Sequence, residues 1–335
     1  MEKVYYFRED LRNVTEYYYN IILSALRSNS CMVIETNWIS FKEIPRSKSV
    51  YVLVTRDRDL LKLFLSGFRN FIFWFQGIGP EERFMMNGYT NKLKYYFNSM
   101  IECLALRKSK YKIVVSKYQK EHYVKKYHLN EKKHVFFIMP CYNSEIHKNS
   151  FFVEEKYEQN IFCYAGGMQI WQGFDLMLSF YKEIEKMNDN VCLRIYSKDV
   201  EQSKAAIKKY KIKNWSVECL SPKDLDVALS HCKFGFILRE DNVVNNVATP
   251  TKLATYVGNG VIPIYTAALS SYRDLALTHK YLCCVDNVKD INPVLKYLNT
   301  KINGEDVYKD FSDLYDGYFN TEKYVQALSS YFTEK

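Results

Sequence analysis

Residues 249–252 (Thr-Pro-Thr-Lys) place two hydroxyls and an ammonium group at the predicted start of a helix. The helix follows a short apolar strand, residues 234–238, and an asparagine-rich loop. Thr249 can cap the helix with its hydroxyl, and Pro250 suits the first helical position, where no amide hydrogen is needed. The free backbone amides and the helix dipole then favour an anion such as a diphosphate. The alternative is an ordinary capped helix with Lys252 in solvent.

A second polar cluster follows the apolar strand FIFWF, residues 71–75. Its members are Gln76, Gly77, Glu81, Glu82 and Arg83. The carboxyl end of a parallel strand is where α/β proteins place their ligands, so the cluster predicts contacts to a substrate. Either glutamate could position an acceptor hydroxyl or act as a base. The alternative is that both are first-turn acids of a helix that starts near Pro80.

Alternating strands and helices must position these two clusters. The predicted strands of the first half are residues 4–7, 32–35, 50–54, 70–75, 112–116 and 134–138, and its helices are 13–27, 60–66, 89–107 and 117–127. The predicted strands of the second half are residues 161–165, 191–196, 216–220, 234–238, 261–265 and 281–285, with helices at 171–186, 200–210, 223–231, 250–257, 269–275 and 291–298. This alternation predicts an α/β protein with two Rossmann-like, doubly wound parallel sheets.

The predicted division places one domain at residues 1–150 and a second at 151–320, because the periodicity lapses around residues 142–156. The segment 321–335 is predicted to form a helix that packs back on the first domain. At 335 residues the chain is long enough for two hydrophobic cores.

Charge is divided unevenly between the two halves. Residues 1–150 hold 25 basic and 14 acidic side chains, whereas residues 151–335 hold 22 and 24, within a net charge of +9. A basic first half favours an anionic partner: a membrane surface, a lipid phosphate or a nucleic acid. The alternative is a solvated lysine-rich face.

The nine cysteines are scattered and show no C-x-x-C spacing, which favours reduced thiols in the cytoplasm over disulfides or a zinc site. Neither a signal segment nor an apolar run of about 18 residues is present, so we expect a cytoplasmic protein, peripheral on the inner face of the plasma membrane where it touches lipid.

Two segments of the second half, YAGGMQIWQGFDLMLSFY and LREDNVVNNVATPTKLATYVGNGVIPI, resemble the retaining GT-B glycosyltransferases of the family-4 type. The likeness is greatest to the branch that assembles bacterial capsule, exopolysaccharide and lipopolysaccharide. In the first half it rests on FWFQGIGPEE and IVVSKYQKEHY. The resemblance implies two domains that face each other across a cleft. It also implies transfer of a sugar, with retention of configuration and without a metal or other cofactor, from a nucleotide-diphosphate sugar to a hydroxyl of a lipid-linked oligosaccharide.

The resemblance also implies which residues bind the donor. Gly166 and Gly167 match the glycine turn that lets the backbone approach the diphosphate. Gln172 stands where the family commonly has lysine, and Arg239 could restore that charge. Tyr196 and Ser197 match a loop that flanks the nucleotide base, as do residues 220–222. The predicted donor-binding residues are Gly166, Gly167, Gln172, Tyr196, Ser197, Arg239, Glu240, Asn245, Thr249, Pro250, Thr251 and Lys252.

One departure concerns the two glutamates that the family carries seven residues apart. They fall near Val247 and Thr255 here, and Glu240 could reach the donor sugar instead. Gln76 matches a polar residue near the reacting sugar. The predicted catalytic residues are Gln76, Glu81 and Glu240, and the predicted acceptor contacts are Gln76, Gly77, Glu81, Glu82 and Arg83. The leaving phosphate itself can take the acceptor proton, so no pair of catalytic carboxylates is needed.

Two other functions stay open at this point. The missing glutamates allow a non-catalytic GT-B-like subunit that partners an active enzyme. The run of basic and aromatic residues at 107–133 allows nucleic-acid binding, although lysines on the outside of a strand and two helices explain it better.

Overall fold

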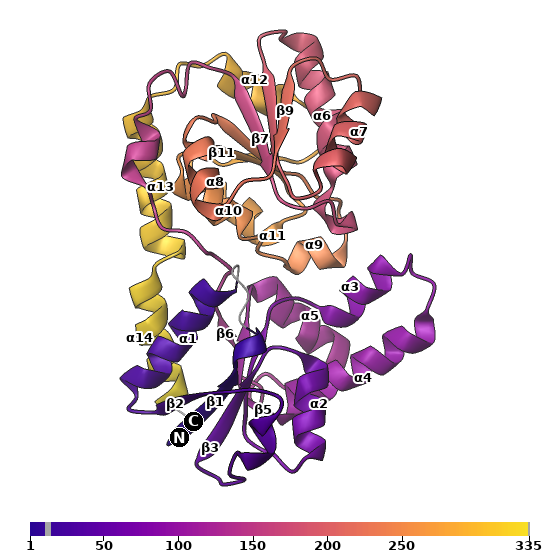
Figure 1. Ribbon diagram of the computed structural model, residues 1–335, viewed down its shortest axis with the longest axis vertical. Coiled ribbons are helices and arrows are strands. Elements are labelled where there is room, and N and C mark those ends of the chain that lie inside the picture. Colours follow the sequence, from indigo (N-terminus) through magenta and orange to yellow (C-terminus); the bar gives the residue numbers. More distant parts are fainter. Residues whose placement is uncertain (11–14, 334–335) are drawn as a thin grey trace. The chain divides into compact units, whose positions relative to one another are not determined.

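The chain folds into two compact units, each built on its own parallel β-sheet (Figure 1). The computed structural model describes residues 1–10 and 15–333. The first unit holds Met1–Asn143, the short segment Val247–Thr249 and the C-terminal residues from Asn320 onwards; the second holds Ser144–Asn246 and Pro250–Phe319. Within the described ranges, no helix is both long and apolar enough to cross a membrane.

The first sheet has six parallel strands in the order β2-β1-β3-β4-β5-β6. Their bounds are Lys3–Phe7 (β1), Met32–Thr36 (β2), Val50–Val54 (β3), Phe71–Phe75 (β4), Ser109–Val114 (β5) and Phe137–Ile138 (β6). The helices of this unit are α1 (Glu16–Ser28), α2 (Asp57–Leu65), α3 (Gly79–Met86), α4 (Lys92–Lys108), α5 (Lys117–Tyr127) and α14 (Thr321–Thr333). Every residue of β3 and β4 is buried, as expected for central strands covered on both faces.

The second sheet also has six parallel strands, in the order β12-β11-β10-β7-β8-β9. Their bounds are Ile161–Ala165 (β7), Cys192–Tyr196 (β8), Trp215–Glu218 (β9), Phe234–Ile237 (β10), Ile262–Thr266 (β11) and Cys283–Val285 (β12). Its helices are α6 (Phe174–Met187), α7 (Val200–Lys209), α8 (Pro222–Ser230), α9 (Val243–Val247), α10 (Lys252–Gly258), α11 (Ser270–Leu275), α12 (Asn292–Leu298) and α13 (Gly304–Tyr318). Short 3-10 turns lie at Arg8–Asp10, Ser40–Glu43, Lys148–Phe151 and Ile170–Gln172.

All twelve predicted strands are present in the described residues, and the predicted α/β class is confirmed. The strand predicted at 112–116 is shifted to Ser109–Val114. The helix predicted at 13–27 begins, as described, at Glu16, and residues 13 and 14 lie outside the described residues. Helix α13 was not predicted, although its buried residues Val307, Phe311, Leu314 and Tyr315 follow helical spacing.

Helix α14 packs on α1 in the first unit. The Asn29 side chain donates to the carbonyl oxygen of Ser329 at 2.7 Å, and the Tyr111 hydroxyl donates to that of Phe332 at 2.9 Å. These bonds satisfy polar groups near the end of the chain while the apolar face of α14 is buried. The last two residues of the predicted segment 321–335 lie outside the described residues.

Candidate functional site

Strands β7 and β10 are neighbours in the second sheet, but the strands that follow them lie on opposite sides. The chain continues from β7 to β8 in one direction and from β10 to β11 in the other. Such a topological switch point leaves a crevice at the carboxyl edge of a parallel sheet, where ligands bind. The loop after Ala165 and the loop after Ile237 meet at this edge, and both carry predicted donor-binding residues.

Gly166 begins the first of these loops in a conformation that side chains rarely adopt, with φ +147°. A Cβ atom at this position would lie 2.5 Å from Lys252 Cε and 2.6 Å from Lys252 Nζ. The Gly166 amide donates to the carbonyl oxygen of Tyr196 at 2.9 Å, which ties the turn to the end of β8. The backbone conformation therefore requires a glycine, and any larger residue would also displace the end of the Lys252 side chain.

The Lys252 ammonium is held beside this turn. Its Nζ donates to Gln172 Oε1 at 2.8 Å and lies 4.0 Å from the centre of the Tyr164 ring. Burial, together with the nearby Arg239 guanidinium, holds the pKa of Lys252 well below its usual range. Gln172, the amide that stands where the resembled family commonly has lysine, thus holds the Lys252 ammonium group in position.

Arg239 supplies the second cation of the site and is 4% exposed. Its Nη1 donates to the carbonyl oxygen of Trp171, and burial lowers its pKa to about 10. Its Nε is buried without a hydrogen-bond partner, and neither Arg239 nor Lys252 forms an ion pair with any carboxylate in the part of the chain that the structure describes. A buried guanidinium and a half-buried ammonium group without a carboxylate partner among the described residues would suit an anion at this edge.

Thr249 does not cap a helix, contrary to the prediction. Helix α10 begins at Lys252 with Thr251 as its helical N-cap residue, and no side chain caps it. The Thr249 hydroxyl instead accepts from the Cys141 amide at 3.1 Å, and the carbonyl oxygen of Pro250 accepts from the Tyr272 hydroxyl at 2.6 Å. The local cap is lost because these tertiary hydrogen bonds hold residues 249 and 250 outside the helix.

Other predicted donor contacts hold the loops together. The Gly167 carbonyl oxygen accepts from the Tyr164 hydroxyl at 2.6 Å, and Ser197 Oγ accepts from the Asp199 amide at 3.1 Å. The Asn245 side chain donates to the carbonyl oxygen of Glu240 at 2.9 Å. The Tyr196 ring is buried with its hydroxyl 3.8 Å from Cys232 Sγ, so its side chain points into the core rather than toward the loops.

Glu240 lies at a pocket of about 640 Å³ at the carboxyl ends of β10, β11 and β12. Arg239, Arg273 and Asp286 line the same pocket. Val247 is buried, and Thr255 Oγ1 donates to the carbonyl oxygen of Thr251 at 3.2 Å. Where the resembled family has its two glutamates, this chain thus has a buried valine and a threonine whose hydroxyl donates to a backbone carbonyl four residues earlier.

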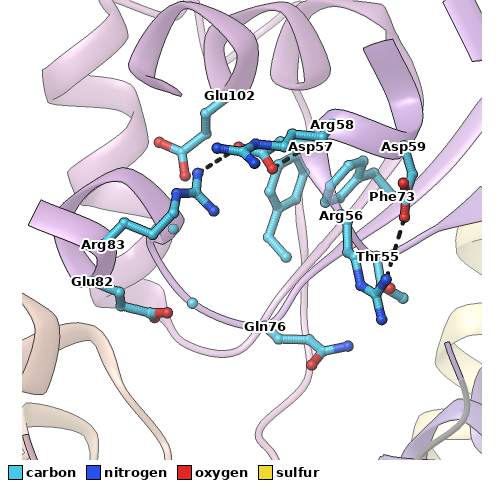
Figure 2. A pocket seen from close by; sticks show the side chains of 13 residues that line it. Thr55, Arg56, Asp57, Arg58, Asp59, Phe73, Gln76, Glu82, Arg83 and Glu102 are labelled. Carbon is cyan, nitrogen blue, oxygen red and sulfur yellow. Dashed lines mark hydrogen bonds and ion pairs between the residues drawn. The ribbon is translucent and has the colours of Figure 1, made fainter. Parts of the chain in front are cut away.

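The second predicted cluster lines a pocket of about 440 Å³ in the first unit, at the carboxyl ends of β3 and β4 (Figure 2). Gln76, Gly77, Glu82 and Arg83 all contribute to its wall. The remaining polar lining was not predicted. It comes from the start of α2 and from α4: Thr55, Arg56, Asp57, Arg58, Asp59 and Glu102. The alternation of arginine and aspartate at residues 56–59, directly after a predicted strand, is the sequence feature that could have indicated this lining.

Guanidinium and carboxyl groups alternate around this pocket. Arg83 Nη2 lies 2.9 Å from Asp57 Oδ2, and Arg58 Nη2 donates to Asn98 Oδ1 at 3.3 Å. Figure 2 shows Arg58, Arg83 and Glu102 on one side of the pocket, opposite Gln76. Such a lining offers both donors and acceptors to the hydroxyl groups of a sugar.

Glu81 does not line this pocket. Its carboxylate is buried in a cluster in which Lys126 Nζ lies 2.7 Å, His122 Nε2 3.3 Å and the Tyr95 hydroxyl 3.1 Å from Oε1. Burial alone would raise the pKa of Glu81, but the close approach of His122 and the charge of Lys126 lower it to about 2. A carboxylate with so low a pKa is a weak base, so Glu81 fits a structural role better than the predicted catalytic one.

Burial raises the pKa of Glu82 and raises that of Glu102 to about 7, although Lys126 and the Tyr127 hydroxyl oppose the second shift. Glu102 Oε2 accepts from that hydroxyl at 2.6 Å. Glu102 can therefore take up or release a proton near neutral pH, whereas Glu81 cannot.

The raised pKa of Glu102 predicts a pH-dependent stability. A raised pKa means that the folded chain binds the proton more tightly, so the stabilisation is complete below the unfolded value and is lost as the pH rises to about 7. We expect Glu102→Gln to gain up to about 3 kcal/mol relative to wild type between about pH 5 and about pH 8. Urea unfolding across this range measures the difference, and a difference independent of pH would contradict the assignment.

The lysine-rich run at 107–133 is only partly available to an anionic partner. Lys112 is buried and donates to the carbonyl oxygen of Ser109 at 2.5 Å, while Lys126 belongs to the Glu81 cluster. Lys120 Nζ lies 2.7 Å from Glu131 Oε2. These contacts favour a structural role for part of the run and weaken the nucleic-acid alternative.

Solved structures show which fold these two units make. TarM from S. aureus, bound to fondaparinux, α-GlcNAc-glycerol and UDP, matches with a TM-score of 0.61 at 12% identity, over 87% of this chain and 57% of TarM. Sucrose-phosphate synthase from Thermosynechococcus elongatus matches with a TM-score of 0.71 at 10% identity, over 100% and 99% of the two chains. HepE from Anabaena, bound to UDP and glucose, matches with a TM-score of 0.68 at 8% identity over the full length of both chains.

The chain therefore has the GT-B fold, with two Rossmann-like units and a six-stranded parallel sheet in each. It spans little more than half of TarM but the whole of the other two proteins. No model of a known protein family matches the sequence, and no curated protein sequence matches it significantly. At such identities the shared fold is established, and function rests on the sites described above.

Proposed function

We propose that this chain is a glycosyltransferase that moves a sugar from a nucleotide-diphosphate sugar to a hydroxyl group. The observation that carries the proposal is the pair of cations, Lys252 and Arg239, beside the Gly166 turn of a GT-B fold. A diphosphate supplies the counter-charge that both cations lack within the described residues. TarM and HepE, which share the fold, are both solved with UDP bound, and this supports UDP-type donors.

The two cations have a direct role in the proposed chemistry. Negative charge builds on the diphosphate as the glycosidic bond breaks, and cations already in position stabilise it without reorganisation. Gln172 holds the Lys252 ammonium at 2.8 Å, which fixes its position before the donor arrives. A bound diphosphate raises the lowered pKa of Lys252 again, so the lysine is protonated when it is needed. Because this charge comes from side chains, we propose that transfer requires no metal ion.

We place the acceptor sugar at the pocket of the first unit, with Gln76, Glu82 and Arg83 as its contacts. The mixed lining of guanidinium and carboxyl groups suits hydroxyl groups. Retention of configuration and membership of the family-4 type are the finer parts of the proposal and rest on the sequence resemblance. In this chemistry the leaving phosphate takes the acceptor proton, which agrees with the low pKa of Glu81. The acceptor that we propose is a lipid-linked oligosaccharide of bacterial surface polysaccharide synthesis.

A nucleotide panel tests the donor site. Thermal melting is measured with UDP, GDP, CMP, dTDP and ADP on wild type, on Lys252→Ala and on the exposed control Lys223→Ala. A ligand that binds only the folded state, at about 100 times its dissociation constant, adds roughly 2.7 kcal/mol of stability. We expect one nucleotide to stabilise wild type and the Lys223 variant, and to lose most of this effect in the Lys252 variant.

The melting panel, together with a transfer assay on the corresponding nucleotide sugars, separates the alternative function. Stabilisation by a nucleotide without turnover of any nucleotide sugar would favour the partner-subunit function, which the residues at 247 and 255 allow. If no nucleotide shifts the melting of any variant, the donor-site proposal is wrong.

A further inference from the structure

Helices α3 and α4 and the turn between them expose an unusual number of large apolar side chains. Figure 1 shows the two helices as neighbours joined by a short turn. The exposed side chains range from 53% accessible for Tyr89 to 85% for Leu93. We call this surface the apolar stripe, and its members are Met86, Tyr89, Leu93, Tyr96, Phe97 and Met100. These six side chains are exposed to solvent, so they add nothing to the hydrophobic core of the first unit.

Helical spacing aligns the stripe on one side of α4. Leu93, Tyr96, Phe97 and Met100 follow the i, i+3, i+4, i+7 pattern of a single helix face. The opposite side of α4 is buried and includes Ile101, Ala105 and Leu106, together with the polar Asn98, Ser99 and Glu102. The helix is therefore apolar toward solvent as well as toward the core, an arrangement that marks an interaction surface.

The charged residues of the segment that carries the stripe are all positive. Lys92 and Lys94 are exposed and lie on the two sides of the stripe, each one residue away from Leu93. Between Arg83 and Glu102 the sequence contains no acidic residue. Lysines beside an apolar helix face can extend their ammonium groups to anionic head groups while the apolar side chains enter the lipid.

We propose that the apolar stripe docks this protein on an anionic lipid bilayer, with its apolar side chains at the boundary of head groups and acyl chains. The inference deepens the proposed function and rests on it, because a lipid-linked acceptor is available only at a membrane surface. A second copy of the chain fits the stripe less well. A two-fold contact would bring Lys92 and Lys94 of both copies together, and the stripe has no acidic residue to pair with them.

Vesicle co-sedimentation tests the proposal with the full chain. Wild type is mixed with phosphatidylcholine vesicles and with phosphatidylcholine–phosphatidylglycerol vesicles, without nucleotide or acceptor. The apolar test variant is Leu93→Ser/Phe97→Ser, and its matched control is Met32→Ser/Ile39→Ser, which removes two exposed apolar side chains elsewhere in the same unit.

The charge test variant is Lys92→Glu/Lys94→Glu, and Lys132→Glu/Lys133→Glu is its control, because these two lysines are exposed and lie outside the stripe. Each basic side chain near an anionic leaflet contributes about fivefold to binding. We expect wild type and both controls to bind the anionic vesicles, and both test variants to bind at least about tenfold more weakly.

Equal binding of all five proteins, or binding that does not depend on phosphatidylglycerol, would overturn the proposal. Sedimentation velocity without vesicles tests whether a second copy of the chain binds the stripe instead. If Leu93→Ser/Phe97→Ser converts a dimer to a monomer and leaves vesicle binding intact, the stripe is a dimer interface and the proposal is wrong. The nucleotide-induced shift in melting temperature is measured on every variant as well. Its retention shows that the variants fold, and separates a failure of docking from a failure of the donor site.

Discussion

Gly166→Ala is expected to abolish nucleotide-induced stabilisation and sugar transfer, and to lower the free energy of unfolding by about 1–3 kcal/mol. The stability loss follows from φ +147° at this position, which an alanine adopts only with strain. The binding loss has a separate cause. The new Cβ would lie 2.6 Å from Lys252 Nζ, so the ammonium has to leave the place where we propose that it meets the diphosphate.

Gly67→Ala is the matched control for this variant. Gly67 also has a positive φ, +96°, but a Cβ atom there would meet nothing within 4 Å. The control should lose stability through strain while the nucleotide still raises its melting temperature as in wild type. If Gly166→Ala binds nucleotide as well as the control does, the approach of Lys252 to the turn has no part in donor binding.

Lys126→Met is expected to destabilise the first unit by about 3–5 kcal/mol, because it leaves buried carboxyl groups without their cation. Lys126 Nζ lies 2.7 Å from Glu81 Oε1 and 3.4 Å from Glu102 Oε2, and both carboxyl groups are almost fully buried. After the substitution His122 is the one partner with a potential positive charge that the described residues still offer to Glu81.

Lys120→Met controls for the loss of a lysine from the same helix. Lys120 makes an ion pair with Glu131 of the same length, 2.7 Å, but at the surface, where such pairs contribute about 0–1 kcal/mol. Urea unfolding of both variants measures the contrast. Adding Glu102→Gln to Lys126→Met should recover part of the loss at pH 8, because the Glu102 carboxyl group, whose pKa is about 7 even with Lys126 beside it, no longer has to ionise without a cation. Similar stabilities for the two lysine variants would show that the buried cluster is not a coupled unit.

The two parallel sheets could be predicted because the sequence patterns that indicate them extend over only a few residues. Short apolar runs such as VYVLV and FIFWF can be buried on both faces only in a parallel sheet covered by helices, and they recur at strand–helix spacing in both halves. The glycine turn after β7 and the lysine at the start of α10 were also identifiable from residue types alone. Helix α13 was not predicted from residue types, because its few apolar positions at helical spacing lie among many acidic residues and tyrosines.

The sites depended on contacts between distant segments. The rotation of α3 decided which of its two glutamates lines the pocket. The Glu81 carboxyl contacts Lys126, whereas the Glu82 carboxyl lies against Gly77 in the pocket wall. Glu102 reaches the same pocket from α4, which local spacing could not show.

The amino-acid sequence by itself determined which segments become strands and helices, and which residue types stand at the sheet edges. Apolar period, glycine and proline act over a few residues, so their effect can be read along the chain. Only the tertiary structure decided that Thr249 bonds to Cys141 instead of capping α10, and that Lys252 and Arg239 lie together without a carboxylate in the described chain. Hydrogen bonds and charges act through space, and folding brings their partners together from positions far apart in sequence.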